Sequence, residues 1–110
     1  AARRVAFDVS GTVVKISRSM LGYLGKCDFI DRMDDVETDE AIELDYPLSI
    51  FDDFHCALVA ARCDTARAMT MLLTALERPR GIVLSDLLNY LGYDWLLGKR
   101  FETPLALRTA

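Results

Sequence analysis

The chain has 110 residues, of which 52% are hydrophobic, and a formal net charge of −4. This length predicts one domain, and the apolar fraction excludes an intrinsically disordered chain. Residues 28–53 carry eleven acidic side chains and one basic side chain, Arg32, whereas both ends of the chain are basic. An acidic middle argues against nucleic acid as a partner, because the phosphates would be repelled.

Cysteine usage and hydropathy indicate the compartment. The three cysteines are an odd number at irregular spacing, which is typical of free thiols in a reducing environment. No apolar run reaches the ~18 residues that a membrane span needs. His55 and Cys56 with Cys63 match no common zinc spacing. We therefore expect a cytoplasmic protein with no membrane partner, no metal and no cofactor.

Two short strands joined by a tight turn are predicted at the start of the chain. Residues 5–9 and 13–16 alternate apolar and polar side chains, as strands with one buried face do. Ser10 and Gly11 between them are typical turn residues. An antiparallel hairpin is the simplest connection.

Short elements are predicted next. Ser17 can cap a short helix that stops near Gly25. A second short apolar turn follows it, and residues 34–40 are polar and typical of a loop. Alternation over residues 41–45 predicts a third short strand.

Helices are predicted for the second half. They are a helix over 47–61, a helix capped by Asp64, a helix that Ser85 opens and Gly92 ends, and a short turn that starts at Asp94. The predicted fold class is therefore α+β, with a small three-stranded sheet and a cluster of helices. We expect a domain over residues 1–98 and a tail or the start of a linker over residues 99–110.

Residues 5–14 resemble the first motif of haloacid-dehalogenase-like hydrolases, a strand that ends in D-x-D-G-T. Asp8, Gly11 and Thr12 fit this motif, and the resemblance implies that Asp8 is a catalytic nucleophile. Ser10 stands where the phosphatases of that family place an acid. The family also needs later acids for magnesium and a longer parallel sheet, which the remaining chain does not suggest. This hydrolase is the alternative hypothesis.

A second resemblance covers more of the chain. The pattern Val5-x-Phe7-x-Val9-x-Gly11, followed by a strand and a Ser-capped helix, resembles the opening of BTB/POZ domains. The likeness is greatest to the tetramerisation-domain branch of potassium channels and their soluble relatives. It continues, in order, through residues 27–33, 42–51 and 87–93. The zinc-binding set of some of these domains is absent, since the cysteines do not have its spacing.

The BTB/POZ resemblance implies a BTB/POZ-like fold and a role without catalysis. It implies a homo-oligomer and, as a further partner, a cullin-type ubiquitin ligase scaffold for which the chain is an adaptor. Assembly of a larger subunit is the other role within this family.

Acidic residues are the candidate partner-binding residues: Asp34, Asp35 and Glu37 in the polar loop, and Asp52 and Asp53 on the helix over 47–61. The acidic middle could also help two copies attach head to tail, through contact with basic residues of the other copy. On the same helix, Phe51 and Phe54 recur at helical spacing, and we expect them to lie in the core. No catalytic residue is expected in this hypothesis.

Overall fold

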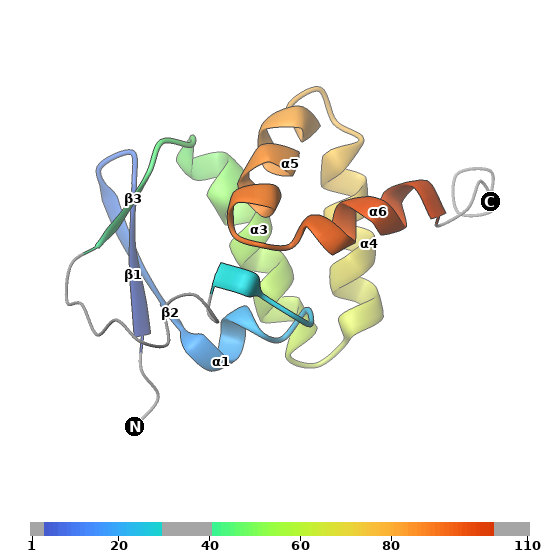
Figure 1. The fold of residues 1–110 in the computed structure, drawn as a ribbon, viewed down its shortest axis with the longest axis horizontal. Helices are drawn as coiled ribbons and strands as arrows, with labels where there is room; N and C mark the ends of the chain where they lie inside the picture. The colour runs from blue at the N-terminus through green and yellow to red at the C-terminus, as the bar shows by residue number, and fades with distance from the viewer. Residues whose placement is uncertain (1–3, 30–40, 103–110) are drawn as a thin grey trace.

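Three strands pair in the order β2-β1-β3 (Figure 1). The structure, a computed structural model, describes residues 4–29 and 41–102. β1 (Arg4–Val9) and β2 (Thr12–Ser17) run antiparallel, and β3 (Ile42–Leu44) lies parallel to β1 on its other side. A small three-stranded sheet with a cluster of helices is the α+β arrangement that the sequence predicts, and this prediction is confirmed.

β1 has one buried face and one face nearer to solvent. Val5, Phe7 and Val9 are buried, whereas Ala6 and Asp8 are partly exposed. This is the alternation predicted from the sequence, because successive strand residues point to opposite faces. It places Asp8 on the face of the sheet that points away from the core.

The helices of the described residues gather on one side of the sheet (Figure 1). Their bounds are α1 (Arg18–Leu21), α3 (Leu48–Ala61), α4 (Thr65–Leu76), α5 (Gly81–Tyr90) and α6 (Asp94–Glu102). Helix α3 is central, because it contacts α1, α4 and α5. None of the helices in residues 4–29 and 41–102 combines the length and the apolar character that crossing a bilayer requires.

Two predicted helix caps are confirmed. The Ser17 hydroxyl accepts a hydrogen bond from the Met20 backbone N–H at 3.1 Å, and an Asp64 carboxylate oxygen accepts one from the Arg67 N–H at 3.0 Å. Each cap satisfies a donor that the first turn of a helix leaves without a helical partner. Each is worth about 1 kcal/mol of stability.

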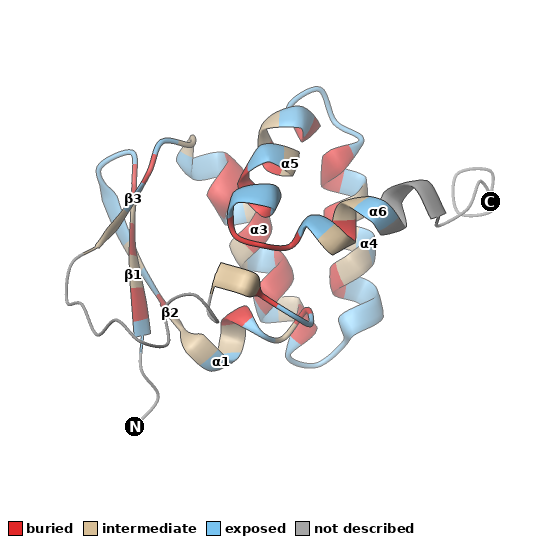
Figure 2. Ribbon diagram, in the orientation of Figure 1, coloured by how far each residue is buried: buried red, intermediate tan, exposed pale blue. Residues whose placement is uncertain are grey.

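Aromatic side chains join the sheet to the helices. Phe51 and Phe54 on α3 are fully buried, as predicted, and α3 is lined with buried positions along its inner side (Figure 2). The Phe51 ring centroid lies 5.5 Å from that of Phe7, and the Phe54 centroid lies 5.4 Å from that of Tyr93. These spacings are those of favourable aromatic pairs. The core therefore runs from β1 through α3 to the α5–α6 junction.

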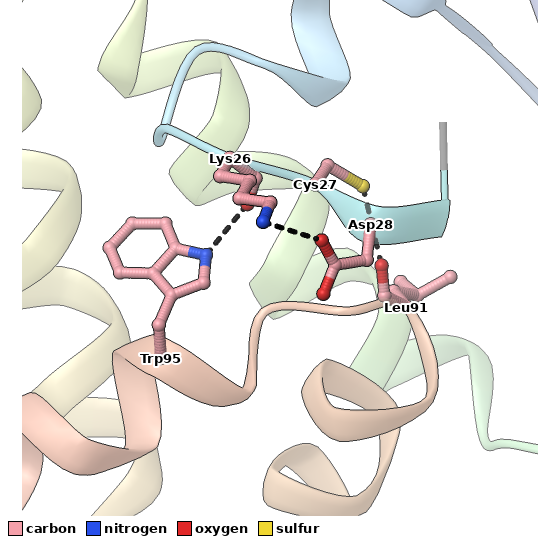
Figure 3. A network of polar contacts seen from close by, with 5 residues as sticks. All are labelled: Lys26, Cys27, Asp28, Leu91 and Trp95. Atoms are coloured by element: carbon pink, nitrogen blue, oxygen red, sulfur yellow. Dashed lines mark hydrogen bonds and ion pairs between the residues drawn. The ribbon is translucent and has the colours of Figure 1, made fainter. Parts of the chain in front are cut away.

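The segment after α1 is held against the α5–α6 junction by a polar network (Figure 3). The Trp95 indole N–H donates to the Lys26 carbonyl oxygen at 2.6 Å. The Cys27 thiol donates to the Leu91 carbonyl oxygen at 3.3 Å, and Lys26 Nζ lies 3.4 Å from Asp28 Oδ1. Parts of the chain more than sixty residues apart are thus joined near the middle of the molecule.

The first helix is shorter than predicted. α1 ends at Leu21 with Gly22 as its C-cap, whereas the sequence predicts a helix that stops near Gly25. The Leu21 carbonyl accepts a hydrogen bond from the buried Tyr93 hydroxyl. The last helical carbonyl therefore has its partner in the core and needs no further helical turn.

Two later predictions of helix bounds were wrong. α5 begins at Gly81 instead of Ser85. A Cβ at Gly81 would lie 1.9 Å from the Leu76 carbonyl oxygen, so a glycine allows the first turn of α5 to pack against the end of α4. The predicted turn at the end of the domain is a helix of nine residues, and it continues beyond residue 98 to Glu102.

Candidate interaction surfaces

Asp8, on which the two hypotheses differ, takes part in the β1–β2 turn. Its Oδ1 accepts a hydrogen bond from the Gly11 backbone N–H at 2.9 Å. Ser10 and Gly11 have φ angles of 50° and 95°, and positive φ at both positions is typical of a two-residue hairpin turn. The Ser10 hydroxyl donates to the Tyr46 carbonyl at 2.7 Å, which joins the turn to the segment after β3. The Asp8 carboxylate therefore has a structural partner in its own turn.

The acidic residues predicted to bind a partner fall into two groups. Asp34, Asp35 and Glu37 lie outside the described residues. Asp52 is exposed and Asp53 is half-buried, and both lie on α3 as predicted. The two neighbours have different surroundings, since only Asp53 lines a groove.

This groove lies between α3 and α4, and we call it the α3–α4 groove. It has a volume of about 370 Å³, and its lining includes Asp53 and Cys56 from α3 and Arg67 from α4. A second hollow of about 460 Å³ continues it toward the start of α5. Both hollows include Asp53 and Arg78, and the second adds Arg80.

Positive charge predominates in the groove. Arg78 Nη1 lies 3.9 Å from Asp53 Oδ1, which for exposed side chains is a weak ion pair. Arg80 donates to the Ser49 hydroxyl at 3.2 Å. Within the described part of the chain, the Arg67 guanidinium has no ion pair with a carboxylate. Three guanidinium groups therefore face one carboxylate.

A second surface follows α5 and the connection into α3. We call it the α5 surface, and its residues are Tyr46, Leu48, Ile82, Asp86 and Tyr90. Ile82 is 82% exposed, Tyr90 47% and Leu48 36%. Three of these residues follow one another at intervals of four on α5, which puts them on one helix face. Figure 2 shows exposed positions along the outer side of this helix.

A hydrogen bond orders the middle of the α5 surface. The Tyr46 hydroxyl donates to Asp86 Oδ2 at 2.7 Å. Desolvation of the ring hydroxyl, and after it the hydrogen bond to Asp86, raise the pKa of Tyr46 to about 12. The hydroxyl therefore remains a donor at neutral pH and holds the connection before α3 against α5.

Histidine and cysteine side chains do not gather in the described residues. Cys27 is buried, whereas Cys56 and Cys63 are exposed free thiols. The ring centroid of His55 lies 6.2 Å from that of Phe51. In residues 4–29 and 41–102, no group of three or more His, Cys, Asp or Glu side chains could hold a metal ion.

Comparisons with protein-family models, with curated proteins and with solved structures found no match. The resemblance to BTB/POZ domains therefore stays a prediction. It depends on the residues quoted above and on the order of the strands and helices.

Sequence reasoning missed the groove and the α5 surface. Arg67 lies in the first turn of α4 and Arg78 lies beyond its last residue, so no helical spacing joins the two arginines in the sequence. The groove forms through the packing of α3 against α4, for which the sequence has no local signal. Ile82 was missed because the helix was expected to begin only at Ser85, so that its first turn was read as a break.

Proposed function

We propose that this chain is a protein-interaction module that associates with copies of itself and docks a further protein on the α5 surface. The observation that carries the proposal is the exposure of Leu48, Ile82 and Tyr90 on that surface. Large apolar side chains in contact with water are a common mark of an interaction surface when they gather in one place. The hydrogen bond between Tyr46 and Asp86 orders this surface in advance, which lowers the entropic cost of binding.

The BTB/POZ resemblance suggests the class of partner. The described elements follow in the order hairpin, short helix, strand and then helices, which is the order expected for that family. On this ground we propose a cytoplasmic adaptor for a cullin-type ubiquitin ligase scaffold. Assembly of a larger subunit is the other role that the same fold would serve.

The surroundings of Asp8 give no support to the hydrolase alternative. Its carboxylate accepts the Gly11 N–H in the hairpin turn. In the described residues β1 belongs to a mixed sheet of three strands, whereas the hydrolase fold has a long parallel sheet. We therefore propose that the carboxylate shapes the turn and does no chemistry.

The solution mass tests the proposal. A self-associating module has a mass well above 12.4 kDa in light scattering at several concentrations, and an adaptor is retained by a purified cullin on a column. Asp8→Asn leaves both results unchanged. Release of phosphate from an aryl phosphate with magnesium, lost in Asp8→Asn, would instead establish the hydrolase.

A pair of variants tests the α5 surface. Ile82→Glu puts a charge on the most exposed apolar residue of the surface, and we expect it to weaken cullin retention at least about tenfold, as loss of an interface anchor does. Val59→Glu is the matched control, because Val59 is 52% exposed on α3 and is not part of this surface. Equal retention of both variants would contradict the assignment.

A further inference from the structure

We propose that the α3–α4 groove binds the acidic segment, residues 31–40, of a second copy of this chain. The inference rests on the proposed function, because it names one of the contacts by which copies associate. It assigns a different surface from the one that docks the cullin. Charge, spacing and apolar character each support it.

Charge complementarity is the first argument. Arg67, Arg78 and Arg80 line the groove and its continuation, against the single carboxylate of Asp53. Residues 31–40 carry six acidic side chains and one basic side chain. In a chain with a net charge of −4, this groove is a local positive region and the segment is the densest negative one. Opposite potentials of this kind steer association and set its register.

Spacing is the second argument. Arg67 lies in the first turn of α4 and Arg78 lies two residues beyond its end, and the nine residues of helix from Arg67 to Leu76 span about 14 Å. An extended peptide covers a comparable length in about five residues, at about 3.3 Å each. Asp34 and Asp39 are five residues apart. In an extended segment, the separation of these two carboxylates is therefore comparable to the length of α4 that lies between the arginines.

The floor of the groove provides the third argument. Met71 and Ala75 line it between the two arginines, and the continuation adds buried apolar atoms of Ile50. The acidic segment includes Met33 and Val36 among its carboxylates. An apolar strip flanked by positive charge suits a peptide that mixes apolar and acidic residues.

Asp53 makes the proposal specific. Its carboxylate lies among the arginines, 3.9 Å from Arg78, and would repel an acidic occupant. Asp53→Asn removes this repulsion and leaves Arg78 without its competing partner, so we expect about two- to fivefold tighter association. Asp52→Asn removes one exposed acid that does not line the groove and is the matched control. The two variants have the same net charge.

The two surfaces make the contact head to tail. The groove and the segment are different parts of one chain, so each copy can offer its groove to one neighbour and its segment to another. Such a heterologous contact closes into a ring or continues as a chain of subunits. A defect in either part can therefore be complemented by a copy that is defective only in the other.

Mixing two variants of the whole chain tests this. The groove variant is Arg67→Glu with Arg78→Glu, and the segment variant is Asp34→Asn with Asp35→Asn and Glu37→Gln. We expect each alone to associate at least about tenfold more weakly than wild type in light scattering. An equimolar mixture regains a dimer of twice 12.4 kDa.

A synthetic peptide of residues 31–40 gives a second measurement. In a fluorescence titration it binds the Asp34→Asn, Asp35→Asn, Glu37→Gln variant, and at least about tenfold more weakly when the groove is reversed as well. The same peptide with amides in place of its six carboxylates is the control. Far-UV circular dichroism establishes that every variant is folded.

The outcomes separate the inference from the proposed function. Wild type that is oligomeric, with the groove variant unchanged in mass and in peptide binding, overturns the inference and leaves the self-associating module intact. Wild type that is monomeric at every concentration overturns both. Complementation in the mixture, together with tighter association of Asp53→Asn but not Asp52→Asn, establishes the contact.

Discussion

Gly92 lies where the chain passes from α5 to α6, and replacing it with alanine tests the packing that presents both surfaces. Its φ angle is 88°, in the left-handed region that favours glycine. A Cβ built there would lie 2.7 Å from Asp28 Cβ and 2.8 Å from the Asp28 backbone nitrogen. A side chain at this position would therefore be strained by the left-handed backbone and would clash with Asp28, which belongs to the polar network of Figure 3.

The expected cost has two parts. Left-handed backbone costs a non-glycine residue about 1–2 kcal/mol. Overpacking adds about 1–3 kcal/mol, and the upper part applies here because a backbone nitrogen, unlike the end of a flexible side chain, cannot move aside alone. We expect Gly92→Ala to lower the free energy of unfolding by about 3–5 kcal/mol, a large share of the about 5–15 kcal/mol that stabilises a typical domain.

Urea unfolding followed by circular dichroism measures this change. The matched control is Gly98→Ala, since Gly98 lies inside α6 with nothing within 4 Å of a built Cβ. That variant should be stabilised by up to about 1 kcal/mol, because alanine is the better helix former. If Gly92→Ala does not fold, Gly11→Ala isolates the backbone part alone, since its φ is 95° and its surroundings are open. A Gly92→Ala protein within about 0.5 kcal/mol of wild type would refute the reasoning.

Three further changes have defined outcomes. Trp95→Phe removes the indole donor to the Lys26 carbonyl and should cost about 0.5–1.5 kcal/mol in the same unfolding assay, so an unchanged midpoint would argue against this bond. Tyr46→Phe should destabilise the protein below about pH 10, because it removes the hydrogen bond to Asp86. The difference in stability from wild type should fade as the pH rises toward 12, because the folded-state pKa of Tyr46 is raised to about 12 and the bond stabilises the fold only while the tyrosine is protonated. Asp8→Ala should cost about 0.5–2 kcal/mol by loss of the turn acceptor without changing the solution mass, whereas a change of mass would show that this residue takes part in assembly.

Local chemistry made the first part of the fold predictable. The alternation of Val5, Phe7 and Val9 places them on one face of β1, and the capping roles of Ser17 and Asp64 are each fulfilled within a few residues of chain. Such patterns involve near neighbours only, so the sequence contains all the information they need.

Contacts between distant residues explain what the sequence did not predict. α1 stops at Leu21 because its carbonyl meets Tyr93, which is 72 residues away. α5 can begin at Gly81 because a residue without a Cβ fits against the end of α4. The end of α1 and the start of α5 both depend on tertiary packing, which no local sequence pattern predicts.

In the candidate surfaces too, local features are predictable from the sequence and contacts between distant residues are not. The sequence places Asp52 and Asp53 next to each other on a helix, and the helix is confirmed. Which of the two lines a groove depends on where α4 packs, because α4 and the turn after it bring Arg67 and Arg78 to the groove that Asp53 lines. The sequence shows the charges, and the packing decides which of them meet.

The dependence of self-association on salt distinguishes the repulsion between the net charges of two copies from the attraction between the groove and the acidic segment. Two copies of net charge −4 repel each other, and at 0.01 M salt this repulsion reaches across about 30 Å, whereas at 0.1 M it reaches about 10 Å. Contacts of a few ångströms between arginines of the groove and an acidic segment still act at 0.1 M but are screened at 1 M, where the range is about 3 Å. We therefore expect association to be strongest near 0.1 M and weaker at both extremes. A steady rise of the mass with salt up to 1 M would instead identify an apolar contact between copies, and the groove would not be their interface.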